Sequence, residues 1–62
     1  MKLIYITKQH VLINADKIAS IDYTNGYTSF NLVNDTGYSV DGDFISDVLE
    51  ILKKEGPRVI YI

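Results

Sequence analysis

Hydrophobic and polar residues alternate along most of the chain, but not in its two terminal segments. Residues 3–6 read Leu-Ile-Tyr-Ile and residues 59–62 read Val-Ile-Tyr-Ile, so an extended strand is apolar on both faces in each segment. Such strands are expected to be covered on both sides. One short helix cannot provide both covers. We therefore expect the second cover to be another protein surface, most simply a second copy of the chain.

Turn signals divide the chain into strands. Extended segments are predicted at residues 2–7, 11–14, 18–24, 27–33, 38–40 and 58–62. The Asn25-Gly26 dipeptide tolerates positive φ at both central positions of a turn, which makes it the strongest hairpin signal in the chain. Gly37 is the expected left-handed residue of a second hairpin turn at residues 34–37.

The segment after Asp41-Gly42-Asp43 has the spacing of an amphipathic helix. The predicted inward stripe comprises Phe44, Ile45, Val48, Leu49, Ile51 and Leu52, and the predicted outward stripe comprises Ser46, Asp47, Glu50, Lys53 and Lys54. An Asp at the start can accept hydrogen bonds from the free N–H groups of the first turn. Gly56 and Pro57 are expected to end the helix.

The resulting order β-β-β-β-β-α-β predicts a single α+β domain over residues 1–62, with a small antiparallel β-sheet that carries the helix on one face. The inner face of the sheet is expected to contribute Ile21, Tyr23, Phe30, Leu32, Tyr38 and Val40 to the core.

A domain of 62 residues buries only about 60% of the surface that its unfolded chain exposes. Cysteine is absent, so disulfides are excluded, and an unusually well-packed core or self-association must supply the remaining stability.

The charge pattern disfavours nucleic acid as a partner. The net charge is -2, and the six basic residues are dispersed along the sequence instead of forming the basic stripe that binds phosphates. Met1 leads directly into a strand-like segment, with neither a signal peptide nor a membrane span. A cytoplasmic protein without membrane contact is therefore expected.

No constellation of side chains predicts catalysis. His10 falls in a predicted turn without a recognisable nucleophile. Asp41, Asp43 and Asp47 do not have the spacing of a calcium loop and are typical of a helix start. We expect no enzymatic activity, no cofactor and no metal site.

Two tyrosines are the strongest candidates for partner contact. Tyr5 and Tyr61 lie in the doubly apolar terminal segments, whereas Tyr23 and Tyr38 are expected in the core. The predicted interface therefore comprises Tyr5, Ile60, Tyr61 and Ile62.

Residues 11–55 resemble the small FlbD-type bacterial flagellar proteins. The resemblance lies in VLINADKIASID, the hairpin TSFNLVNDTGYSV and the acid-led helix. The chain departs from that pattern at Ala15, where proline is common, at the inserted Thr36, and in the extra strand after Pro57. The family is linked to motility and has no known catalytic chemistry, so the resemblance implies no active-site residue.

The stretch from Asp16 into the helix is also similar to the first half of LytTR-type DNA-binding domains. In that family the segment after the helix carries a basic, histidine-containing motif that helps to contact DNA. Only Arg58 could take that place here.

The main hypothesis from the sequence is a non-catalytic cytoplasmic interaction module of bacterial or phage origin. Residues 58–62 are expected to pair with residues 3–7, and the chain is expected to form a homo-oligomer, most simply a dimer, through these terminal strands. An unidentified protein is the other partner considered. One alternative is a LytTR-like domain that binds nucleic acid and regulates transcription. The other is a small acidic viral inhibitor that blocks a basic surface of a host enzyme.

Overall fold

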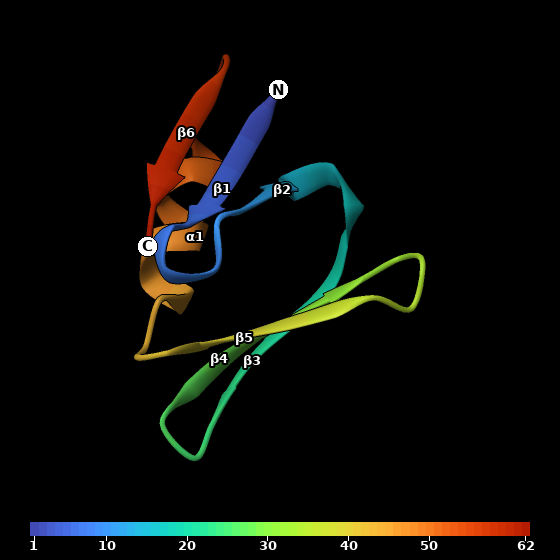
Figure 1. Cartoon of the computed structure of the whole chain (residues 1–62). Coiled ribbons are helices and arrows are strands. Elements are labelled where there is room, and N and C mark those ends of the chain that lie inside the picture. The colour runs from blue at the N-terminus through green and yellow to red at the C-terminus, as the bar shows by residue number, and fades with distance from the viewer.

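The computed structural model describes all 62 residues as an α+β fold (Figure 1). The strands are β1 (Lys2–Ile6), β2 (Val11–Asn14), β3 (Ile18–Thr24), β4 (Tyr27–Leu32), β5 (Gly37–Asp41) and β6 (Arg58–Tyr61), and the helix is α1 (Ile45–Lys53). Two 3₁₀ helices, η1 (Thr7–Gln9) and η2 (Ala15–Lys17), follow β1 and β2. The predicted class and the predicted order of strands and helix are confirmed.

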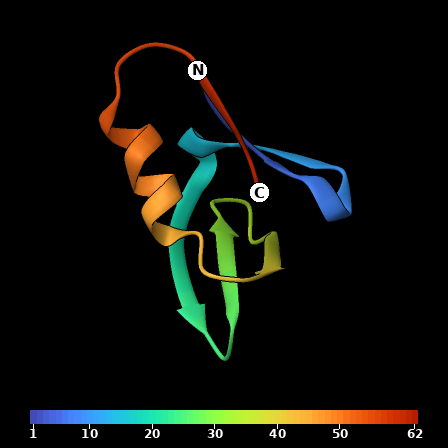
Figure 2. The ribbon, with the colours of Figure 1, turned by 90° about the vertical axis from the view of Figure 1, so that its left-hand side faces the viewer.

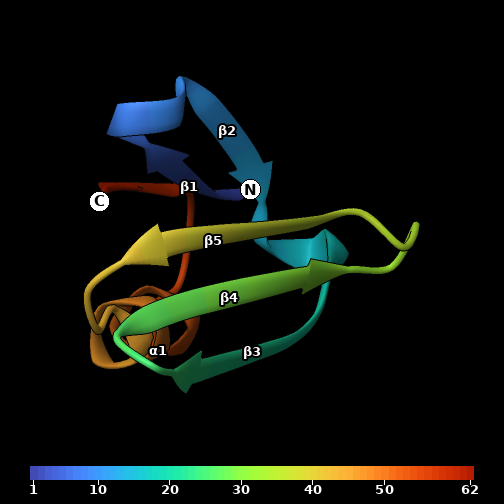
Figure 3. The same ribbon diagram turned by 60° about the horizontal axis from the view of Figure 1, so that its bottom comes forward.

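The strands form two sheets, whereas the sequence predicted one antiparallel sheet (Figures 1 and 3). Sheet A has the order β2-β1-β6, and sheet B has the order β3-β4-β5. Neighbouring strands are antiparallel except β1 and β6, which run parallel. The chain leaves sheet A at η2, where the Asn14 side chain accepts a hydrogen bond from the Asp16 N–H group at 3.0 Å. This turn separates the first hairpin from the three strands that build sheet B.

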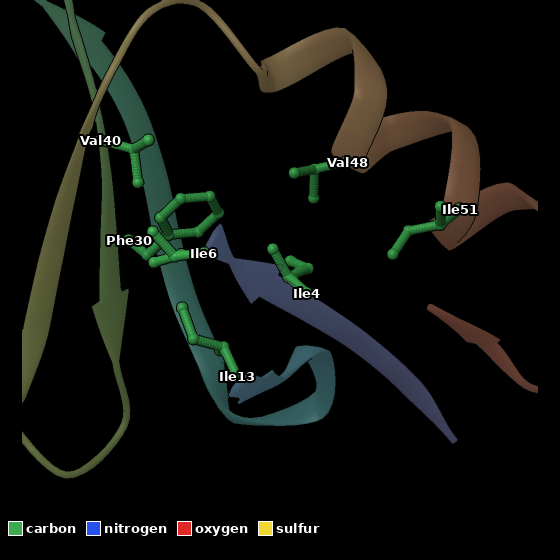
Figure 4. Packing of buried hydrophobic residues seen from close by; sticks show 7 residues of the cluster. All are labelled: Ile4, Ile6, Ile13, Phe30, Val40, Val48 and Ile51. Carbon is green, nitrogen blue, oxygen red and sulfur yellow. The ribbon is translucent and has the colours of Figure 1, made fainter. Parts of the chain in front are cut away.

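The core lies between sheet A, sheet B and α1 (Figures 2 and 4). Its buried apolar residues are Ile4, Ile6, Ile13, Phe30, Val40, Val48 and Ile51. Phe30 and Val40 confirm the predicted inner face of sheet B, and Ile4 and Ile6 come from the central strand of sheet A. Each large apolar side chain in this group stabilises the fold by about 1.5–3 kcal/mol through burial.

Three positions predicted to be in the core are wrong. Tyr23 lies on the inner side of edge strand β3, but its place near the strand end leaves it exposed. On α1, Leu49 is 49% exposed and Leu52 is also exposed, whereas Val48 is 1% exposed. The helix contacts the core along a stripe narrower than its run of apolar residues, and this run alone does not define which part of it faces inward.

The two hairpin turns of sheet B use left-handed residues at different places. Asn25 and Gly26 have φ values of 54° and 86°, which confirms the predicted turn. In the second turn Asp35 has a φ of 65°, so the prediction that Gly37 is left-handed is wrong. Asn34 accepts a hydrogen bond from the Thr36 N–H group at 3.2 Å, and this side-chain turn fixes the loop without a left-handed glycine.

Side-chain hydrogen bonds fix both ends of α1. The buried Thr28 hydroxyl donates to the Gly42 carbonyl at 2.6 Å and accepts from the Phe44 N–H group at 3.0 Å. Asp43 accepts from the Ile45 N–H group at 3.2 Å, so an acid does bind the first turn as predicted. At the far end, the Lys2 ammonium donates to a helix carbonyl, that of Leu52, at 3.2 Å. A cation there also complements the negative end of the helix dipole.

Candidate interaction surface

The side of sheet A that faces away from the core is apolar and uncovered. Its side chains line a shallow depression, which we call the outer patch, and they are Leu3, Tyr5, Leu12, Val59 and Tyr61. Figure 1 shows β1 and β6 in front of α1, with no element in front of them. Tyr61 is 74% exposed, and Leu12 and Val59 are also exposed.

Strand register arranges the outer patch in rows. Tyr5 lies opposite Leu12 on β2 and opposite Tyr61 on β6, so these three side chains form one row across the sheet. Leu3 and Val59 are neighbours in the next row. Cross-strand neighbours of this kind lie close enough for apolar side chains to touch. The outer patch is therefore contiguous across all three strands of sheet A.

His10 lies at the rim of the outer patch. Its Nδ1 atom is 3.1 Å from the Tyr5 hydroxyl oxygen, so the polar end of Tyr5 has a hydrogen-bond partner. His10 itself has a left-handed φ of 54° and ends η1. This geometry gives His10 a structural role, positioning Tyr5.

The structure divides the predicted interface residues between the two faces of sheet A. Tyr5 and Tyr61 are together in the outer patch, whereas Ile60 and Ile62 pack partly buried against the core on the other face. A strand that is apolar on both faces gives no sequence signal of which face is inward. Leu12 was not predicted, because Val11, Leu12 and Ile13 are all apolar and the sequence does not show which of them lies on the outer face.

A second surface feature runs along the free edge of β6. There a groove separates β6 from α1, and it is lined by Asp47, Glu50, Ile51, Lys54, Ile60, Tyr61 and Ile62. The inward isoleucines of β6 therefore remain accessible at this edge.

Folding gathers basic residues that the sequence disperses. Lys2 is opposite Arg58 in the β1–β6 pair, and its ammonium group donates to the Leu52 carbonyl in the last turn of α1. Lys53 and Lys54 directly follow Leu52 at the end of the helix. Cations at this end complement the helix dipole, so the basic end of the molecule has a structural explanation.

No cluster of His, Asp and Glu residues is arranged to hold a metal ion. None of the helices has the length and apolar character needed to span a membrane.

No protein-family model, curated protein or solved structure matches the chain. The resemblances to FlbD-type and LytTR-type proteins therefore remain predictions from the sequence, and a functional proposal depends on the surfaces themselves.

Proposed function

We propose that the chain is a non-catalytic protein-interaction module that self-associates through its terminal strands, most simply as a dimer. The outer patch is the observation that supports this proposal. A contiguous apolar surface of this kind is typical of protein-interaction sites, and tyrosines are enriched at their centres. A cytoplasmic protein of bacterial or phage origin is part of the proposal, and the FlbD-type resemblance supports a bacterial one.

The small core supports self-association independently. Only nine of the 62 residues are buried, and no disulfide is available to stabilise the fold. Small domains of this kind have little free energy of unfolding to spare. A second copy that binds only the folded chain stabilises it by mass action.

Light scattering coupled to size exclusion tests the proposal. At concentrations on the order of tens of micromolar, where weak specific association is measurable, we expect a mass of twice 7.0 kDa. Tyr61→Asp should shift the mass to that of the monomer, because it places a charge in the apolar contact. Tyr27→Asp is the matched control, since Tyr27 is also exposed but lies on sheet B. A monomeric natural chain at these concentrations would contradict the proposal.

The basic end of the molecule favours one second candidate, a LytTR-like nucleic-acid-binding domain. Its basic residues are Lys2, Lys53, Lys54 and Arg58. Lys2 is already engaged with α1, and the chain is acidic overall, so we expect only non-specific affinity of about 10⁻⁴ to 10⁻⁶ M at physiological salt. Fluorescence anisotropy decides between the candidates, because a nanomolar sequence-specific complex would favour DNA binding.

A further inference from the structure

The backbone of β6 has one unpaired edge. Arg58 and Ile62 donate their N–H groups toward β1, at 3.1 and 2.8 Å. Successive residues of a strand in a parallel pair direct their backbone groups to opposite sides, so those of Val59 and Tyr61 point away from β1. β6 is the last strand of sheet A on this side, as Figure 1 shows. These groups form a template for another strand.

The edges of sheet B are less suited to pairing than the β6 edge. On β3 the register shifts between Ile18 and Ser20, and such an irregularity disrupts an edge for pairing. On β5 the Ser39 carbonyl already accepts a hydrogen bond from the Gln9 side chain at 2.7 Å. The register of β6 with β1 is regular over all four residue pairs.

The groove beside β6 carries charges of both signs, from Asp47, Glu50 and Lys54. Asp47 and Lys54 both line it and lie two helical turns apart, on the same side of α1. A two-fold axis perpendicular to α1 makes the α1 helices of the two copies run antiparallel. Asp47 of each copy then faces Lys54 of the other, which gives two attractive contacts for each dimer.

We infer that a second copy adds its β6 antiparallel to this edge, so that the two A sheets become one continuous sheet with the two α1 helices side by side. The inference rests on the proposed self-association and names its contact. The Ile62 N–H group also binds β1, so the extended segment runs from Arg58 to Ile62, and the register that pairs most of its residues places Ile60 opposite Ile60 of the second copy. It also places Tyr61 against Val59 of the second copy, which covers part of the most exposed side chain of the outer patch.

Charge exchange in the groove tests the contact. Lys54→Glu and Asp47→Lys each create two like-charge contacts in a dimer, and we expect the dissociation constant to rise about tenfold. A mixture of these two variants should dimerise with the affinity of the natural chain, since the mixed dimer restores both attractive contacts. Lys53→Glu is the control, because Lys53 is the neighbouring exposed lysine and does not line the groove.

A cysteine at the two-fold axis gives a second measurement. In the inferred register Ile60 faces its counterpart in a pair without backbone hydrogen bonds, at a Cα separation of about 4.5 Å, which a disulfide can bridge. The natural chain has no cysteine, so any bridge in Ile60→Cys is assigned unambiguously. We expect a covalent dimer on a non-reducing gel, and none for Ser46→Cys, which replaces an exposed residue of α1 outside the groove.

The outcomes separate this inference from the proposed function. A natural chain that remains monomeric would overturn both. A dimer that keeps its affinity in Lys54→Glu and Asp47→Lys, but loses it in Leu12→Lys, is joined through the outer patches of the two copies. That result would overturn edge pairing and leave self-association in place.

Discussion

The Tyr5 and Tyr61 rings meet edge to face across the parallel β1–β6 pair, with centroids 5.7 Å apart and ring planes at 77°. The Tyr5 hydroxyl is also hydrogen-bonded to His10, whereas Tyr61 is largely in solvent. The hydrogen bond to His10 thus positions the Tyr5 ring, and the Tyr5 ring supports that of Tyr61. The aromatic contact links the last strand of the fold to the first.

A double-mutant cycle measures this aromatic contact. We expect Tyr5→Leu and Tyr61→Leu to couple by about 0.5–1.5 kcal/mol in the free energy of unfolding, the range for aromatic pairs. Urea denaturation should be performed at protein concentrations low enough to keep every variant monomeric. Additive effects of the two substitutions would show that the rings do not interact in solution.

Aspartate substitutions at adjacent positions test which side of α1 faces the core. Val48→Asp should unfold the protein, because it places an unpaired charge at a buried site. Leu49→Asp should leave it folded, since Leu49 is half exposed, and Glu50→Ala should have almost no effect. Thermal denaturation followed by circular dichroism gives the order of stability. Equal melting temperatures for the two aspartate variants would contradict the observed orientation of the helix.

Thr28→Val tests the link between sheet B and the start of α1. The substitution keeps the side-chain shape but removes the partner of both the Gly42 carbonyl and the Phe44 N–H group. Leaving buried polar groups unpaired costs about 1–3 kcal/mol, and we expect chemical denaturation to show a loss of stability in that range. Thr28→Ser retains the hydroxyl and should lose less. A Ser variant less stable than the Val variant would show that methyl packing outweighs the hydrogen bonds.

Two glycine substitutions separate backbone strain from crowding. Gly26 has a left-handed φ of 86° and open space around its Cβ direction, so Gly26→Ala costs conformational energy alone, about 1–2 kcal/mol. At Gly37, which is not left-handed, an added Cβ meets the Phe30 carbonyl at an ordinary contact distance of 3.5 Å. Gly37→Ala should therefore be nearly neutral in thermal denaturation. A larger loss at Gly37 would contradict the turn assignment.

Local signals in the sequence predicted the elements well. The bounds of β2 and β3 agree with the prediction, because β2 is followed by the Asn14 turn and β3 by Asn25-Gly26. Alternation also placed Phe30 and Val40 on the inner face of sheet B. These features depend on residues close together in the chain, so short-range patterns are sufficient to define them.

The sequence predicted that residues 58–62 pair with residues 3–7, and the β1–β6 pair confirms this long-range contact. The parallel direction of that pair, the division of the strands into two sheets and the depth of burial could not be predicted from the same patterns. Alternation placed Tyr23 on the correct face but did not show that this part of an edge strand lacks a cover. The outer patch was only partly predicted for the same reason, since Tyr61 and Ile60 have equally apolar surroundings in the sequence.

The parallel pairing of β1 with β6 has a consequence for folding kinetics. The strands of sheet B follow one another through short turns, whereas β6 must return across nearly the whole chain to reach β1. Closing such a long loop carries a larger entropic cost and slows folding relative to local hairpins. Docking of β6 is therefore expected to be the late step. Until it occurs, neither the Tyr5–Tyr61 contact nor the β6 edge exists, so the inferred edge pairing requires a chain that has finished folding.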